Sequence, residues 1–125
     1  MCIRDSLYIA HGDGTPADSF GNGQNDDALG KILRINPLAD GDMPYSIPDS
    51  NPFVNDDTWD TDEVFAMGFR NPHHIAFAED GTIMVADVGR ANAEEVNVIT
   101  SGSNHGWPDR EGIFEHLKEL SLIHI

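Results

Sequence analysis

The sequence is poor in cysteine, in positive charge and in long apolar runs, and each deficit removes a class of structure or partner. The only cysteine is Cys2, so the chain cannot form an internal disulfide. No apolar run approaches the roughly 18 residues of a membrane-spanning helix, so we expect no membrane span. Seven Lys and Arg residues stand against 22 Asp and Glu residues, giving a formal net charge of −15. Such an acidic surface repels nucleic acid and anionic membranes, and we expect neither as a partner.

Both ends of the chain are similar to translated sequencing adapter. Residues 120–125 read Leu-Ser-Leu-Ile-His-Ile, which is the translation of a transposase adapter used to prepare short-read libraries. Residues 1–6 read Met-Cys-Ile-Arg-Asp-Ser, which translates the reverse complement of that adapter. We therefore expect 1–6 and 120–125 to be adapter-derived scars, not native, and 7–119 to be the native segment, truncated on both sides. Because Cys2 falls in a scar, the native segment is expected to hold no cysteine.

The hydrophobic pattern predicts short strands separated by polar loops. Residues 7–11 form a β-type run that stops at a Gly-Asp-Gly sequence, and residues 29–35 alternate apolar and polar side chains with a period of two. Between 38 and 62 the chain is dense in Pro, Asp, Asn and Ser, which is typical of a long functional loop. The acidic run at 56–63 lacks the central Gly and the closing Glu of an EF-hand, so we interpret it as a solvated loop.

Four more strands are expected in quick succession, over 63–69, 74–78, 82–87 and 95–99. The Asp80-Gly81 pair predicts a tight hairpin, and a spacing of about ten residues per strand indicates an antiparallel meander. Four consecutive strands of this kind match one propeller blade, and the strands at 7–11 and 29–35 would belong to the preceding blade. The predicted fold is all-β, about two blades of a β-propeller, and a closed ring would need further blades outside the chain.

Six motifs occur in order along almost all of residues 7–114. They are Leu7-Tyr8-Ile9-Ala10-His11-Gly12-Asp13-Gly14, Leu29-Gly30-Lys31-Ile32-Leu33-Arg34-Ile35, Pro44-Tyr45-Ser46-Ile47-Pro48 through Asn51-Pro52-Phe53, Gly68-Phe69-Arg70-Asn71-Pro72, Val85-Ala86-Asp87-Val88-Gly89 through Glu94-Glu95-Val96-Asn97, and Asn104-His105-Gly106-Trp107-Pro108. Together they resemble the soluble glucose/sorbosone dehydrogenase family, the quinoprotein aldose dehydrogenases that use pyrroloquinoline quinone (PQQ). The resemblance implies a six-bladed β-propeller, of which this chain is roughly a third. It also implies a periplasmic or secreted enzyme that oxidises aldose sugars to lactones by hydride transfer to calcium-bound PQQ.

The resemblance implies that Arg70 and Asn71 face the quinone, with His73 beside them. PQQ carries carboxylates, and an arginine offers a carboxylate two parallel N–H donors. The alternative is that Arg70 tethers a loop to an acidic neighbour. Relatives that bind the cofactor often carry Gln at the position of His73. A metal site formed by His73 and His74 is disfavoured, because adjacent residues of a strand point to opposite faces.

For the calcium that holds PQQ, the resemblance implies ligation by the backbone carbonyls of Gly89 and Arg90. Carbonyl oxygens suit a hard cation, and glycine allows the backbone to approach it closely. Sugar-oxidising relatives often have Pro at the position of Arg90, and others have Gln. Glu94 and Glu95 align with a carboxylate pair near the active site or a structural calcium. The alternative is that both are solvated charges at a strand edge.

The catalytic base of the family is a His just before the first strand, where it takes the proton of the sugar's anomeric hydroxyl. That position lies upstream of Leu7, and His11 is not that residue. We therefore expect no catalytic residue in the chain and no activity of the isolated segment. The expected partners of the parent protein are a sugar and an electron acceptor. Two alternatives remain: a non-catalytic propeller that binds a protein or glycan, and a calcium-dependent propeller of the lactonase type.

Overall fold

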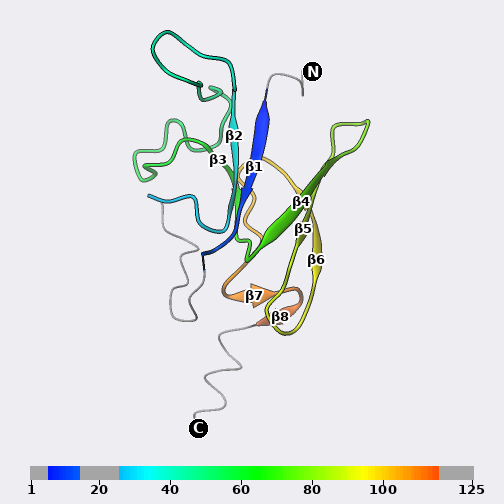
Figure 1. The fold of residues 1–125 in the computed structure, drawn as a ribbon. Helices are drawn as coiled ribbons and strands as arrows, with labels where there is room; N and C mark the ends of the chain where they lie inside the picture. Colours follow the sequence, from blue (N-terminus) through cyan, green and yellow to red (C-terminus); the bar gives the residue numbers. More distant parts are fainter. Residues whose placement is uncertain (1–5, 15–25, 116–125) are drawn as a thin grey trace.

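The computed structural model describes residues 6–14 and 26–115, and every regular element among them is a β-strand (Figure 1). The strands are β1 (Leu7–His11), β2 (Lys31–Ile35), β3 (Val64–Met67), β4 (Pro72–Phe77), β5 (Ile83–Asp87), β6 (Glu95–Ile99), β7 (Arg110–Glu111) and β8 (Phe114–Glu115). The expected adapter scars lie outside the described residues, apart from Ser6. Within the described ranges, no helix is long and apolar enough to cross a membrane. The prediction of an all-β chain is confirmed.

The first sheet has the strand order β1-β2-β3, and both pairs are antiparallel. Strands β1 and β2 pair from Leu7 opposite Ile35 to His11 opposite Lys31. The prediction that 63–69 opens the second blade is wrong, because β3 pairs with β2. The spacing of strands along a sequence does not specify which neighbour each one pairs with. The backbone turns at Gly68, which has a φ of 84°, and so leaves the first sheet before β4 begins the second.

The second sheet has the order β4-β5-β6 and is also antiparallel. Between β4 and β5 the amide of Gly81 donates to the carbonyl of Ala78 at 3.0 Å, and the amide of Ala78 donates to the carbonyl of Thr82 at 2.9 Å. The carboxylate of Asp80 accepts the amide of Thr82 at 2.9 Å, and Gly81 has a φ of 87° that favours glycine. The predicted Asp-Gly hairpin is therefore confirmed.

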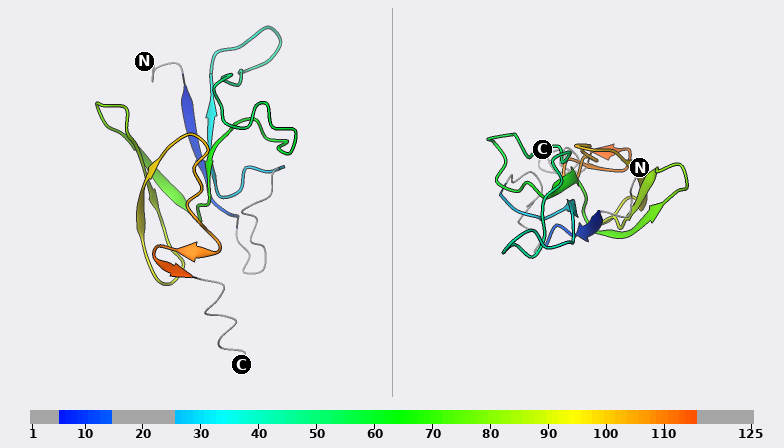
Figure 2. Two further views of the ribbon diagram at one scale, coloured as in Figure 1. Left: turned by 180° about the vertical axis from the view of Figure 1, so that it is seen from behind. Right: turned by 90° about the horizontal axis from the view of Figure 1, so that it is seen from above.

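The core lies between the two sheets, which stand side by side with β7 and β8 at one end (Figure 2). The ring of Tyr8 packs edge-on against Phe65 and Phe77, with centroid distances of 5.2 and 5.4 Å, and so joins β1 to β3 and β4. Phe69 is fully buried, and its truncation to Ala is worth about 3–5 kcal/mol of stability. The buried apolar cluster comprises Ile32, Phe65, Ala66, Phe69, Ile83, Val85 and Ile99.

Strand β6 presents an apolar face to the outside. Val96 and Val98 are 74% and 60% exposed, whereas the alternate side chains Glu95 and Asn97 are half-buried. Along a strand, exposed apolar residues at every second position mark a face suited to packing against another layer. This pattern agrees with the expectation that the chain carries blades whose outer faces need neighbours.

The segment between β2 and β3 has an internal organisation that its composition does not indicate. The side-chain amide of Asn51 donates to the carbonyls of Arg34 and Asp62, at 2.9 and 3.0 Å, and so ties the loop to both of its ends. Phe53 and Trp59 stack with ring centroids 4.1 Å apart. The acidic residues from Asp56 onward are mostly exposed, as the interpretation of a solvated loop requires.

Candidate functional site

The Arg70-Asn71 dipeptide is held in place by Asp87. Asp87 ends β5 and is 5% exposed, and its two carboxylate oxygens accept the backbone amides of Arg70 at 3.0 Å and Asn71 at 2.7 Å. Burial raises the pKa of Asp87, the two amide hydrogen bonds act against this, and the nearby charge of Glu95 raises it further. A side chain from the second sheet thus fixes the backbone from which both predicted quinone contacts extend.

The guanidinium of Arg70 is directed at the segment that follows β5. Its Nη1 donates to the carbonyl oxygens of Val88 at 3.0 Å and Gly89 at 2.8 Å. Its Cζ lies 6.0 Å from the centre of the Trp107 ring, within the range of a cation–π contact. Among the described residues, its buried Nε–H finds no hydrogen-bond partner. The alternative expectation, that Arg70 tethers a loop, matches the two carbonyl contacts, although they are backbone oxygens and not an acidic side chain.

Asp13 connects the end of β1 to this arginine and to a distant tryptophan. The amide of Asp13 donates to the carbonyl of Arg70 at 2.8 Å, and its buried carboxylate accepts the indole N–H of Trp107 at 2.9 Å. Residues 12–14, Arg70 and Asn71 line a pocket of about 220 Å³. The structure therefore places Arg70 and Asn71 at one pocket together with the Gly-Asp-Gly motif.

His73 lies outside this pocket lining. It is exposed and falls where the β4–β5 register shifts between Pro72 and His74. At this bulge the rings of His73 and His74 come into edge-to-face contact, with centroids 5.4 Å apart. The argument that the two point to opposite faces is therefore wrong, because a bulge interrupts the alternation of the strand. Both side chains are exposed, and no group of three potential metal-binding side chains forms around them within the described residues.

The loop from Gly89 to Glu94 is fixed by carboxylates. The amide of Gly89 donates to Glu94 at 3.0 Å. Glu111, on β7, accepts the amides of Arg90, Ala91 and Asn92. The loop itself borders a pocket of about 200 Å³.

Three of the four residues predicted to bind calcium, Gly89, Glu94 and Glu95, accept hydrogen bonds within the chain through their predicted ligand groups. The carbonyl of Gly89 accepts from Arg70, and Glu94 accepts from the amide of Gly89. Glu95 accepts the amide of Gly112 and the side-chain amide of Asn97. No group of three or more His, Cys, Asp and Glu side chains in the described part of the chain is placed to hold a metal.

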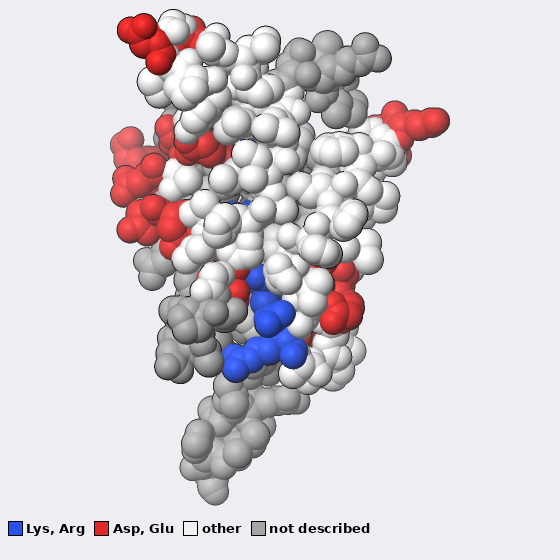
Figure 3. All heavy atoms as spheres, viewed as in Figure 1, with Lys and Arg blue, Asp and Glu red and all other residues white. Residues whose placement is uncertain are grey.

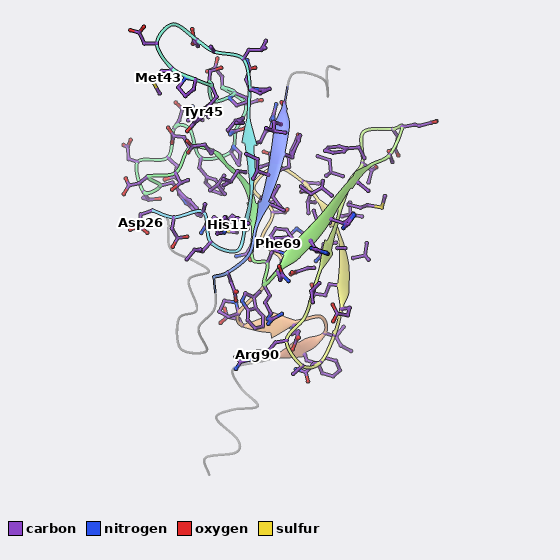
Figure 4. All side chains as sticks on the ribbon, viewed as in Figure 1. His11, Asp26, Met43, Tyr45, Phe69 and Arg90 are labelled. Atoms are coloured by element: carbon purple, nitrogen blue, oxygen red, sulfur yellow. The ribbon has the colours of Figure 1, made fainter. Side chains whose placement is uncertain are left out.

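Positive charge is concentrated at this end of the molecule. Figure 3 shows a patch of Lys and Arg side chains near the β7–β8 end, with acidic side chains to either side. Figure 4 places Arg90 at that end, and the guanidinium of Arg70 touches the residue before it in the sequence. On a chain with a net charge of −15, this patch is a local site of attraction for an anionic ligand.

Comparison with known proteins identifies the family. The profile of the family described as Glucose / Sorbosone dehydrogenase matches residues 2–116. The chain belongs to the glucose/sorbosone dehydrogenase family. The motif resemblance is thereby confirmed over almost the whole length of the chain.

Individual members of the family and solved structures are similar to most of this chain. The HIPL2 protein of Arabidopsis thaliana is 38% identical over 85% of the chain, and quinoprotein glucose dehydrogenase B of Acinetobacter calcoaceticus is 33% identical over 67%. Among solved structures, the soluble aldose sugar dehydrogenase of Escherichia coli matches 84% of the chain with a TM-score of 0.71 at 26% identity. The PQQ-bound aldose sugar dehydrogenase of Streptomyces coelicolor matches 85% with a TM-score of 0.66 at 27% identity. The fold is that of a partial sugar dehydrogenase β-propeller.

The chain covers only part of each of these family members. It spans 17% of the length of the HIPL2 protein, 16% of the Acinetobacter glucose dehydrogenase and 28% of the E. coli structure. Activity, substrate and partners of a whole protein therefore depend on more than the residues described here.

Proposed function

We propose that this chain forms part of the cofactor site of a longer quinoprotein that oxidises an aldose to its lactone, with PQQ as the hydride acceptor. The observation that carries the proposal is the pairing of Arg70 with Asn71 at one pocket, on a backbone anchored by Asp87. Family membership supports it, as do relatives whose names include a quinoprotein glucose dehydrogenase and a PQQ-bound aldose sugar dehydrogenase.

The described residues fit the carboxylates of the quinone in two ways. The Nε–H of Arg70 is a buried donor without a partner in the described chain, which is the state expected of a group that completes its hydrogen bonds with a ligand. Asn71 lines the same pocket, is exposed, and offers an amide donor. When bound, PQQ would supply the two-electron acceptor, while these residues bind and orient its carboxylates. His73 lies outside the lining of this pocket and enters the proposal only as a neighbour of Asn71 along the chain.

Calcium would share its predicted ligands with Arg70. Gly89 and Arg90 would offer backbone carbonyls, and the Gly89 carbonyl already accepts a hydrogen bond from the cationic Arg70. A carbonyl oxygen has two lone pairs, so one remains for a divalent cation, at the cost of repulsion between the two cations. The proposal therefore places calcium beside Arg70 at this carbonyl, and the base that removes the sugar's proton lies outside the described residues.

The test is a titration of the full-length protein that contains this segment. PQQ binding is followed by fluorescence quenching, with and without calcium, and aldose-dependent dye reduction is measured in parallel. We expect saturable PQQ binding, a loss of affinity of roughly tenfold or more in Arg70→Ala, and partial recovery in Arg70→Lys, which keeps the charge but loses the forked donor. Arg34→Ala removes the same charge from β2, outside the lining of this pocket, and serves as the control. A folded protein that binds no PQQ contradicts the proposal.

A second candidate is a propeller of the same family that binds a partner without redox chemistry. One observation favours it: the carbonyl expected to hold calcium already accepts a hydrogen bond from Arg70. The HIPL2 protein, whose name states no activity, also has a higher identity to the chain than the bacterial glucose dehydrogenase. Under this candidate, the folded full-length protein shows neither PQQ binding nor dye reduction. The lactonase-type alternative gains no support, because it needs a ring of metal-facing side chains and the described residues hold no such cluster.

A further inference from the structure

Glu111 is a buried carboxylate to which the sequence motifs give no role. It is 2% exposed and lies on β7, far along the chain from the loop that it contacts. One oxygen accepts the amides of Arg90 and, at 2.8 Å, Ala91. The other accepts the amide of Asn92 at 3.1 Å and its side-chain amide at 2.9 Å. Three successive backbone amides and one side chain therefore converge on a single carboxylate.

Successive amides that point to one side form a concavity that binds an anion, and here the anion is a side chain of the same protein. Hydrogen bonds from backbone amides to a carboxylate are of the stronger, charge-assisted kind.

The loop that Glu111 holds begins at the residue that Arg70 contacts. Gly89 has no room for a side chain: a Cβ there would lie 2.5 Å from a carboxylate oxygen of Glu111 and closer still to the carbonyl oxygen of Ala93. The backbone at Gly89 is thus closely packed against both Ala93 and Glu111. That carbonyl in turn accepts from Nη1 of Arg70 at 2.8 Å. A continuous series of contacts runs from Glu111 through the loop to the guanidinium at the candidate cofactor pocket.

We propose that Glu111 is a positioning residue for the cofactor site: by holding the amides of residues 90–92, it sets the Gly89 carbonyl and, through it, the orientation in which Arg70 meets a carboxylate of PQQ. The inference rests on the proposed function. It makes a prediction that a general stabilising role does not make, because Glu111 would affect PQQ only through Arg70.

A double-mutant cycle tests this dependence in the full-length protein. The dissociation constant of PQQ is measured for the wild type, Glu111→Gln, Arg70→Ala and the double variant. Gln has nearly the shape of Glu but loses the charge and presents a donor to one of the amides. We expect E111Q to weaken PQQ binding by roughly tenfold in the wild-type background and by less than about twofold in the R70A background. Equal losses in both backgrounds overturn the inference.

Amide hydrogen exchange gives a readout that does not depend on the quinone. E111Q should raise the exchange rates of the amides of 90–92 by roughly tenfold or more, whereas Glu79→Gln, at the exposed β4–β5 turn, should leave them unchanged. Unchanged exchange in E111Q overturns the inference. If E111Q does not fold, Glu111→Asp keeps the charge on a shorter stem, and an intermediate loss of both protection and PQQ affinity supports the inference.

The two proposals fail in different ways. A wild-type protein that binds no PQQ refutes the proposed function and the ligand part of this inference together, even if E111Q loosens the loop. A wild-type protein that binds PQQ, with an E111Q variant that loses amide protection but keeps its affinity, leaves the proposed function intact and overturns the positioning role of Glu111.

Discussion

Substitution of Gly89 by Ala separates steric room from backbone conformation, two reasons for a glycine that are usually confounded. Gly89 does not have a positive φ, so an alanine can adopt its backbone angles. Its Cβ would nevertheless lie 2.5 Å from Glu111 and 2.8 Å from the carbonyl carbon of Ala93. Because one of these neighbours is backbone, the loop has to move, and it then loses contact with Glu111.

The expected cost is the sum of two effects. Overpacking at a closely packed site costs about 1–3 kcal/mol, and the loss of a hydrogen bond to a charged group costs about 1.5–3 kcal/mol. We expect Gly89→Ala to lower the free energy of unfolding of the full-length protein by about 2.5–6 kcal/mol, measured by urea denaturation at constant m-value.

Two other glycines provide matched controls. Gly41 has a φ of 60° and no atom within 4 Å of a Cβ, so Gly41→Ala should cost only about 1–2 kcal/mol of backbone strain. Gly12 has no positive φ, and its nearest atoms would lie 3.5 Å away, so Gly12→Ala should fall within about 1 kcal/mol of the wild type. The reasoning is refuted if Gly89→Ala proves no more harmful than Gly41→Ala, because the loop would then not pack against Glu111 and Ala93 as described.

Three further predictions use other parts of the molecule. Burial lowers the pKa of His105 below its ordinary value of 6.5. The stability contributed by the neutral ring should therefore be lost as the pH falls below about 6.5. His105→Tyr should reduce the difference between the unfolding free energies measured at pH about 7 and about 5. Trp107→Phe removes the indole N–H that the buried carboxylate of Asp13 accepts, and we expect a loss of about 1.5–3 kcal/mol in urea denaturation, whereas a change below about 0.5 kcal/mol would contradict the contact. Finally, replacement of the exposed Val96 and Val98 by Thr should reduce self-association of the 125-residue chain, measured by light scattering. A wild-type chain that stays monodisperse would show that this face of β6 does not cause self-association.

The elements that the sequence predicted well are those specified by residues close together in the chain. The limits of β1 and β6 agree with the predicted ranges, and Asp80-Gly81 makes the predicted hairpin. Alternation and turn chemistry act over a few residues, so a single sequence carries these features directly.

What could not be predicted depends on partners far along the chain. The pairing of β3 with β2 is a choice between two sheets that alternation does not determine. The support that Asp87 gives to Arg70, and that Glu111 gives to residues 90–92, joins segments 16 to 21 residues apart. At the bulge between Pro72 and His74, one additional residue changes the direction of a side chain. Strands β7 and β8 are only 2 residues long, which is too short to give a periodic pattern in the sequence.

The hydrogen bond between Asp13 and Trp107 joins residues 94 positions apart, and this separation limits when the contact can form during synthesis. A chain that emerges from the ribosome presents Gly12 and Asp13 long before Trp107 and Glu111 exist. The entropic cost of closing such a loop grows only slowly with its length, but closure must wait until the last contacting residue has been synthesised. The contact that buries the Asp13 carboxylate beside Arg70 is therefore made only after every residue of both three-stranded sheets has been synthesised.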